Sequence, residues 1–256
     1  MKYIYLVIIL TGYIFLSSPN RIALDSTFCE INLNHLLGCD RLGRDIFTLL
    51  SYGSISTLVI AIPAKIFSIF FSLFLSLISY TSGRYISLII NSFSSVFLSI
   101  PSLLIALVII YSFGKGFEIF LISLILSDWA MSYETIYSKI SELSNSGFVY
   151  VSKNFGGTDS YIFKKHIIPE LFPLIKILFI TGIPSVIMTI AIYSYMGINF
   201  GSDYFGPGLG EQISFSRDYF DRSPLSIIAP VIGIFLLVNV FNTKNNKKIK
   251  TINEPI

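Results

Sequence analysis

Residues 55–80 read ISTLVIAIPAKIFSIFFSLFLSLISY, and this stretch decides the fold class because it is long, apolar and carries a single charge, Lys65. A helix that crosses a bilayer needs about 20 consecutive residues that are mostly apolar. The stretch meets that length without a second charged residue. It therefore predicts a transmembrane helix that contains Pro63 and Lys65.

Five further apolar stretches accompany it along the chain. They cover residues 3–16, 85–113, 116–137, 172–198 and 225–241. The first is short and could also be the apolar core of a signal peptide, although no clear small-residue cleavage site follows it. Residues 85–113 contain Pro101. We expect an all-α integral membrane protein of about six transmembrane helices.

The composition supports the same class. Of the 256 residues, 53% are hydrophobic and 13% are charged, whereas a soluble domain carries roughly 25% charged residues. The mean hydropathy is +0.73. The net charge of +3 is small and no basic stripe with interleaved aromatic residues is present, so nucleic acid is not expected as a partner. The lipid membrane is the expected surroundings of this chain.

The distribution of lysine and arginine predicts the orientation. If the N-terminus lies inside and the stretches alternate in direction, ten basic residues fall on the inner side and six on the outer side. The inner ones are Lys2, Arg84, Lys139, Lys153, Lys164, Lys165, Lys244, Lys247, Lys248 and Lys250, and the outer ones are Arg21, Arg41, Arg44, Lys115, Arg217 and Arg222. Positive residues favour the cytoplasmic side, so both termini are expected in the cytoplasm, with residues 243–256 as a basic tail.

A predicted inner loop, residues 147–173, reads GFVYVSKNFGGTDSYIFKKHIIPELFP. Gly156 and Gly157 allow backbone angles that other residues avoid. Thr158 can cap a new helix by accepting from a free backbone N–H. Asp159 would then lie in the first turn, where the helix dipole favours an anion. The pattern predicts a helix, a glycine break and a second helix.

The sequence of the same loop also predicts where the second helix ends. Lys165 and His166 fall near the far end of the second helix, where its dipole favours cations. Pro169 cannot continue a helix interior, so we expect the second helix to end there. An ordinary inner loop with a surface helix would show the same pattern.

The segment before residues 55–80 reads HLLGCDRLGRDIFTLLSYGSISTL from His35 to Leu58. It resembles importer permeases of the ATP-binding-cassette (ABC) class, in the branch that serves dipeptides, oligopeptides and nickel. The matching residues are, in order, His35, Leu37, Gly38, Asp40, Gly43, Arg44, Asp45, Tyr52 and Gly53. Leu36 and Cys39 replace the usual proline and threonine. The resemblance extends from His35 to Asn242.

The charged residues of this segment have two interpretations. A metal or catalytic role is conceivable for His35, Asp40 and Asp45. The favoured interpretation is structural, because Asp40, Arg41, Arg44 and Asp45 are well spaced to pair locally and the glycines supply turns. We expect a folded, charged cap at the outer mouth of the second span, without a metal ion.

The inner loop resembles the ATPase-coupling loop of the same family. Gly156 takes the family's glycine position, and Ile167, Ile168 and Pro169 take the place of the family's Ile-x-x-Pro-like ending. The coupling residues implied by the resemblance are Gly156, Gly157, Thr158, Asp159, Lys165, His166 and Pro169. Two departures stand out: residues 150–152 are Tyr-Val-Ser where an acidic-Ala-Ala stretch is usual, and Ile190 replaces an acid.

The resemblance implies a fold and a set of partners. The fold is the type I importer permease fold, with residues 1–54 as the first helix and an extracytoplasmic loop, and residues 55–242 as the transmembrane core. The implied partners are a second permease subunit, two ATPase subunits and an external solute-binding protein, in a bacterial cytoplasmic membrane. A GxxxxGK[ST] phosphate loop is absent from the sequence, so ATP should be used by the partners and no cofactor by this chain.

The implied function is import of di- or oligopeptides, with nickel or a metal chelate as the alternative cargo. An ion-driven secondary transporter is an alternative of another class. A membrane-embedded enzyme is disfavoured, because the two histidines, His35 and His166, are predicted on opposite sides of the membrane. A decayed, inactive permease would explain the two departures.

Two charges within the predicted spans are candidate translocation-path residues. Lys65 lies well inside its span, where an ionisable group is costly and therefore a functional candidate. The favoured alternative is that Lys65 snorkels to the outer surface. Asp128 is expected to face protein or water, and Glu134 to be solvated.

Cys29 and Cys39 are the two cysteines of the chain, and both fall in the first outer loop. A disulfide is permitted outside the cytoplasm. Two unpaired thiols remain the alternative, because a bridge requires the loop to fold back suitably.

Overall fold

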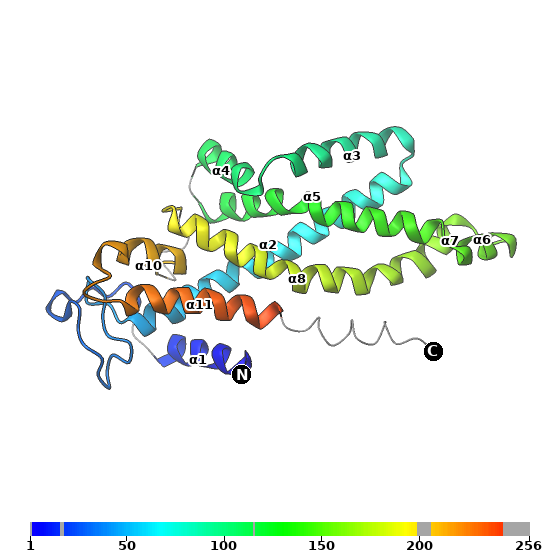
Figure 1. Cartoon of the computed structure of the whole chain (residues 1–256). Helices are drawn as coiled ribbons and strands as arrows, with labels where there is room; N and C mark the ends of the chain where they lie inside the picture. Colours follow the sequence, from blue (N-terminus) through cyan, green and yellow to red (C-terminus); the bar gives the residue numbers. More distant parts are fainter. Residues whose placement is uncertain (1, 16–17, 115, 199–205, 243–256) are drawn as a thin grey trace. The chain divides into compact units, whose positions relative to one another are not determined.

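The computed structural model describes residues 2–15, 18–114, 116–198 and 206–242, and within these ranges the regular structure is helical. The helices are α1 (Lys2–Phe15), α2 (Ile46–Thr81), α3 (Arg84–Ser99), α4 (Ser102–Phe113), α5 (Phe117–Ser144), α6 (Gly147–Asn154), α7 (Asp159–Ile162), α8 (Ile168–Tyr195), α10 (Leu209–Ser216) and α11 (Leu225–Asn242) (Figure 1). Short turns cover Leu24–Ser26, Phe163–Ile167 and Arg217–Tyr219. The predicted basic tail, residues 243–256, lies outside the described residues.

Every apolar stretch expected from the sequence is helical. Three helices are long and apolar enough to cross a membrane by themselves: Ile46–Thr81, Phe117–Ser144 and Asp159–Tyr195. The pair α3 and α4 qualifies together, and the apolar helices Ile4–Ile14 and Leu225–Phe241 are shorter. The all-α membrane class is thus confirmed, while the count of six spans and the cytoplasmic termini stay predictions.

The stretch at residues 85–113 is not one straight helix. It breaks between α3 and α4, which are bent by 95°. Ile100 is extended at φ −99° and ψ 130°, the conformation that a following proline favours in its neighbour. Pro101 therefore produces two short helices, one on each side of the bend.

The chain divides into two compact units. Unit 1 comprises residues 1–62, 115–117 and 183–256, and unit 2 comprises residues 63–114 and 118–182. Within unit 1, α11 packs against both α1 and α10. Within unit 2, α5 carries the core: Trp129, Tyr133 and Ile136 are completely buried.

Pro169 does not end a helix, contrary to the expectation. α7, the following turn and α8 form one uninterrupted helix from Asp159 to Tyr195. The turn Phe163–Ile167 is a π-helix, and the N–H of Ile168 donates to the carbonyl of Phe163. A π turn inserts an extra residue into the hydrogen-bond ladder. We infer that this wider turn allows Pro169 to follow without ending the helix. Lys165 and His166 consequently lie inside a continuous helix.

Candidate functional site

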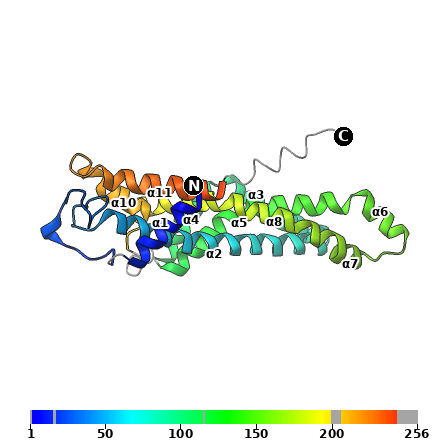
Figure 2. The same ribbon diagram turned by 90° about the horizontal axis from the view of Figure 1, so that it is seen from below.

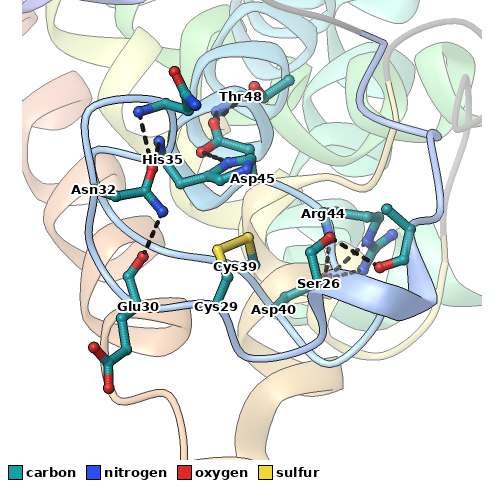
Figure 3. Close-up of polar contacts among 12 residues, drawn as sticks. Ser26, Cys29, Glu30, Asn32, His35, Cys39, Asp40, Arg44, Asp45 and Thr48 are labelled. Carbon is teal, nitrogen blue, oxygen red and sulfur yellow. Dashed lines mark hydrogen bonds and ion pairs between the residues drawn. A yellow bond between two sulfur atoms is a disulfide. The ribbon is translucent and has the colours of Figure 1, made fainter.

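Residues 18–45, which we call the motif loop, hold most of the family-like residues and end in a helix cap. The Oδ2 atom of Asp45 accepts hydrogen bonds from the backbone N and the Oγ1 of Thr48, at 2.7 and 2.8 Å (Figure 3). Its Oδ1 lies 3.1 Å from Nδ1 of His35. Because Asp45 caps it, α2 begins at Ile46 and not at Ile55.

Asp40 organises the centre of the motif loop. Its side chain is 2% exposed, and Oδ1 accepts from the backbone N atoms of Leu42 and Arg44, both at 2.9 Å. Oδ2 accepts from Nε and Nη2 of Arg44, at 2.8 and 2.7 Å. Hydrogen bonds between a guanidinium and a carboxylate are stronger than neutral ones, and here they hold the centre of the loop together. The predicted local pairing of Asp40 and Arg44 is present.

Two glycines of the motif loop are required by its backbone. Gly38 has φ +76° and Gly43 has φ +71°, a region that favours glycine. A Cβ on Gly38 would lie 2.8 Å from the carbonyl oxygen of Cys29, and one on Gly43 would collide with the carbonyl group of Ala23. Backbone conformation and close contacts therefore both require glycine at these positions, which matches the structural interpretation of the motif.

The two cysteines of the motif loop are joined in a disulfide (Figure 3). The backbone holds the same two strands together independently. The N–H of Cys39 donates to the carbonyl of Cys29 at 3.1 Å, and the N–H of Phe28 donates to the carbonyl of Asp40 at 3.1 Å. The loop therefore folds back on itself in the way that a bridge requires.

Tyr52 and Gly53 lie inside α2, beyond the motif loop. A Cβ on Gly53 would be 2.5 Å from Nε2 of Gln212 in α10. That nitrogen donates to the carbonyls of Leu49 and Pro207, at 2.7 and 2.9 Å. Gly53 therefore leaves room for the buried Gln212 amide, whose hydrogen bond connects α10 to the start of α2.

Arg41 does not find the local carboxylate that its spacing predicts. Both nearby acids are occupied, by Arg44 and by the helix cap. The Arg41 guanidinium donates instead to the hydroxyl of Tyr219 and lies 5.6 Å from the ring centre of Phe215. Cation–π contacts of this kind stabilise an exposed arginine modestly. They tie the motif loop to the segment after α10, within unit 1.

A pocket opens beside the motif loop. It has a volume of about 270 Å³ and is lined by Ser18, Pro19, Arg21, Ala23, Ser26, His35, Gly43, Arg44, Asp45 and Thr48. Its ionisable side chains mix cations with a carboxylate, and the carboxylate already caps a helix. The pocket is small for a peptide and suits a solvent-filled recess of the folded cap.

The predicted coupling loop has the helix–glycine–helix form. Gly156 has φ +83° and separates α6 from α7. The Oγ1 of Thr158 accepts from the N–H of Tyr161 at 3.3 Å, as a helix cap does. Asp159 in the first turn pairs with Lys153 at 2.8 Å, and this contact raises the pKa of the Lys153 ammonium.

The coupling loop exposes large apolar side chains. The Phe155 side chain is 88% exposed, and Tyr150 and Val151 are also exposed. All three residues lie on the α6 side of the glycine break, and α6 and α7 lie at the end of α8 that begins at Ile168 (Figure 2).

Lys65 does not snorkel to the surface, contrary to the favoured expectation. It is 4% exposed, and its Nζ donates to Oδ2 of Asp128 at 2.6 Å and to Oγ of Ser132 at 3.3 Å. Ser68 also donates to the same Asp128 oxygen, at 2.8 Å. The buried ammonium is thus paired with an opposite charge, as ionisable residues within membrane spans usually are. The structure thus brings the two predicted path residues together in unit 2.

Gly182 of α8 makes room for this pair. A Cβ at Gly182 would lie 2.6 Å from Nζ and 3.1 Å from Cδ of Lys65. Asp128 remains partly accessible, with 24% of its side chain exposed. Glu134 is exposed, as expected. Sequence reasoning missed Gly182, because a glycine within an apolar span has no local signal.

A row of buried serines on α2 was also not predicted, although its regular spacing is visible in the sequence. Ser68, Ser72, Ser76 and Ser79 are buried and recur at three- and four-residue intervals, which places them on one helix face. Ser72 donates to the carbonyl of Trp129 at 2.7 Å. Small polar residues let spans approach closely and supply hydrogen bonds between them.

Comparison with known proteins identifies relatives over most of the chain. Residues 68–250 match the family model described as "Binding-protein-dependent transport system inner membrane component". The dipeptide transport system permease protein DppC of Alkalihalophilus pseudofirmus is 27% identical over 244 residues, covering 92% of this chain and 80% of that protein. The metal-staphylopine import system permease protein CntC of Staphylococcus aureus is 29% identical over 224 residues, covering 88% and 77%.

Solved structures show the same fold. A chain of an amino acid ABC transporter superposes with a TM-score of 0.63 at 21% identity, covering 80% of this chain and 92% of that chain. A chain of the inward-facing methionine ABC transporter MetNI gives 0.61 at 16% identity, covering 80% and 97%. At these identities the likeness concerns the fold alone.

Proposed function

Because the chain belongs to the family of binding-protein-dependent transport system inner membrane components, we propose that it is the permease subunit through which an ABC importer takes up short peptides. A second permease subunit would complete the path, two ATPase subunits would supply energy, and an external solute-binding protein would deliver the cargo. The chain performs no covalent chemistry in this scheme. Its sequence carries no GxxxxGK[ST] phosphate loop, which supports an ATP site on the partners.

One observation carries the coupling part of the proposal: the coupling loop and α8 are one helix from Asp159 to Tyr195. A helix transmits displacement along its axis, because each turn is hydrogen-bonded to the next. Movement imposed at α7 would therefore reach the membrane-embedded part of α8 without a flexible joint. The π turn at Phe163–Ile167 and the prolines Pro173 and Pro184, which lack an N–H donor, are irregular points on that route.

The exposed apolar side chains of the coupling loop supply the docking surface. Phe155, Tyr150 and Val151 would enter an apolar groove on an ATPase subunit. Aromatic side chains in a fully desolvated pocket are typical anchors of such interfaces. The tyrosine at position 150, where the family's acid is usual, shifts this contact from charge toward apolar burial.

Peptide cargo is favoured by the similarity to a dipeptide permease that covers 92% of this chain. The buried pair Lys65–Asp128 fits such cargo. Its ammonium is buried and neutralised, whereas Asp128 keeps an accessible edge. A partly accessible carboxylate within the spans could meet the amino group of a passing peptide.

Metal-chelate cargo is the second candidate. It is supported by the similarity to the metal-staphylopine permease, which is 29% identical over 88% of this chain. A chelate with free carboxylate and amino groups would use the same polar contacts as a peptide. The solute-binding protein would therefore distinguish the two cargoes more than the spans of this chain would.

Uptake in a deletion strain tests the proposal. A labelled dipeptide, a longer peptide and a labelled nickel chelate are compared in the parent, the deletion strain and the complemented strain. We expect dipeptide uptake to be lost and to be restored only when the ATPase partner is active. Restoration with an inactive ATPase would contradict the importer class, and loss of chelate uptake alone would replace peptides by the second candidate.

A further inference from the structure

We propose that the motif loop contains a redox-dependent zinc site formed by Cys29, His35 and Cys39. In the oxidised loop the two sulfurs are bonded to one another. One ligand atom from each of the three residues nevertheless lies within 4.8 Å of the other two (Figure 3). Two thiolates and an imidazole are ligands that Zn²⁺ prefers, with a water completing a tetrahedron.

The cysteine pair stays in place without the disulfide. The hydrogen bonds Cys39 N to Cys29 O and Phe28 N to Asp40 O, both 3.1 Å, hold the two strands side by side. They involve backbone atoms alone, so reduction leaves them intact. The two thiols of the reduced loop therefore remain neighbours, as a preformed metal site requires.

His35 is positioned by two separate contacts. The Asn32 side chain accepts from the backbone N of His35 at 2.9 Å, within a tight turn. The carboxylate of Asp45 lies 3.1 Å from Nδ1 of the ring, and this contact orients the imidazole. Histidines that bind zinc are usually oriented by a carboxylate or a backbone carbonyl at the ring nitrogen that does not bind the metal.

The site is open to reactants on one side. Cys39 is 1% exposed, whereas Cys29 is half-buried and the His35 side chain is 32% exposed. A small reductant can therefore approach the disulfide through Cys29. The same opening gives the cation a path and leaves room for a bound water.

The chemistry balances with a thiol or phosphine reductant. Two electrons and two protons convert the disulfide into two thiols, while the reductant becomes a disulfide or a phosphine oxide. Zn²⁺ then binds the two thiolates, and both thiol protons are released to solvent. The metal takes over the cross-link that the disulfide provides in the oxidised loop.

The full chain in detergent, purified through a tag without histidine, provides a clean test because it has two cysteines and two histidines. Protein reduced with a phosphine is titrated with Zn²⁺ alone, and bound zinc is counted after desalting. We expect about one zinc per reduced chain and none per oxidised chain. Co²⁺ in place of Zn²⁺ should give the thiolate-to-cobalt charge-transfer band of a tetrahedral site.

Matched variants separate the site from general thiol binding. His35→Gln should weaken zinc binding at least about tenfold, while His166→Gln, at the other histidine, should leave it unchanged. A mass measurement showing the disulfide in oxidised His35→Gln demonstrates that the variant loop still folds. Absence of zinc from the reduced protein, zinc on the oxidised protein, or equal effects of the two histidine substitutions would each overturn the proposal.

Discussion

The motif loop leads from the short apolar helix α1 into α2, and the coupling loop leads from α5 into α8; the two loops are stabilised in opposite ways. The motif loop buries the Asp40–Arg44 pair, closes a disulfide and caps α2 with Asp45. The coupling loop relies on an exposed pair, one threonine cap and a glycine with φ +83°. We infer that the first loop is complete by itself, whereas the second is left to be completed by a partner.

Removing the buried carboxylate of Asp40 should have the largest effect on the stability of the chain. Asp40→Ala leaves Arg44, whose side chain is 12% exposed, without its partner, which costs about 3 kcal/mol of unfolding free energy. Thermal unfolding in detergent measures the loss. Asp159→Ala in the coupling loop removes an exposed pair and should leave the unfolding temperature unchanged. Equal losses in the two variants would contradict the contrast between the loops.

Loss of the disulfide comes next in size. The cysteines are separated by 10 residues, and closing a loop of that length stabilises a folded chain by about 2–3 kcal/mol. The double variant Cys29→Ser/Cys39→Ser should lose this amount in zinc-free buffer. Chemical reduction of the unmodified chain in the same buffer is the control and should give the same loss. A reduced chain as stable as the oxidised one would show that the backbone contacts suffice.

A smaller effect on stability should accompany a large effect on transport at Gly156. No atom lies within 4 Å of a Cβ placed there, so Gly156→Val costs only the strained backbone, about 1–2 kcal/mol. We expect the variant to reach the membrane and to lose uptake. Gly83 also has a positive φ, +88°, and is equally open, so Gly83→Val strains the backbone outside the loop and should keep uptake. Normal uptake by Gly156→Val would remove the coupling role.

The smallest expected effect concerns Glu211 in α10, the helix that packs on the start of α2 within unit 1. Burial raises the pKa of the Glu211 carboxyl, while the Gly208 N–H and the charge of Arg44 act against this rise. The folded chain therefore keeps the proton at pH values where the unfolded chain has lost it. The free energy of unfolding consequently falls as the pH rises through the usual glutamate range.

Glu211→Gln should remove this dependence. The variant is expected to match the unmodified chain at acidic pH and to exceed it slightly at neutral pH. Unfolding temperatures measured across the pH range provide the comparison. A variant less stable than the parent at neutral pH would show that the ionised carboxylate is favourable, and would contradict the cause given for the shift.

Local patterns in the sequence were enough to predict the class of the fold and several turns. The six apolar stretches are helical, Thr158 caps a helix, and Asp40 pairs with Arg44. Each of these depends on neighbours within a few residues, on length or on hydropathy. Such features are visible in a single chain without knowledge of its packing.

Features set by distant contacts were not predictable in the same way. Lys65 finds its partner 63 residues away, and neither residue signals the other. Pro169 lies inside a helix because a π turn precedes it, which the proline rule does not anticipate. Ile46 begins α2 because Asp45 caps it, whereas hydropathy alone places the start of the apolar stretch later.

The unbroken helix from Asp159 to Tyr195 has a consequence in length. Its 37 residues, at a rise of 1.5 Å each, extend about 55 Å along the helix axis. The hydrocarbon layer of a bilayer is about 30 Å thick. The helix is therefore roughly 25 Å longer than the hydrocarbon layer is thick. An excess of this size requires the helix to tilt strongly in the bilayer or to extend beyond the hydrocarbon at its ends.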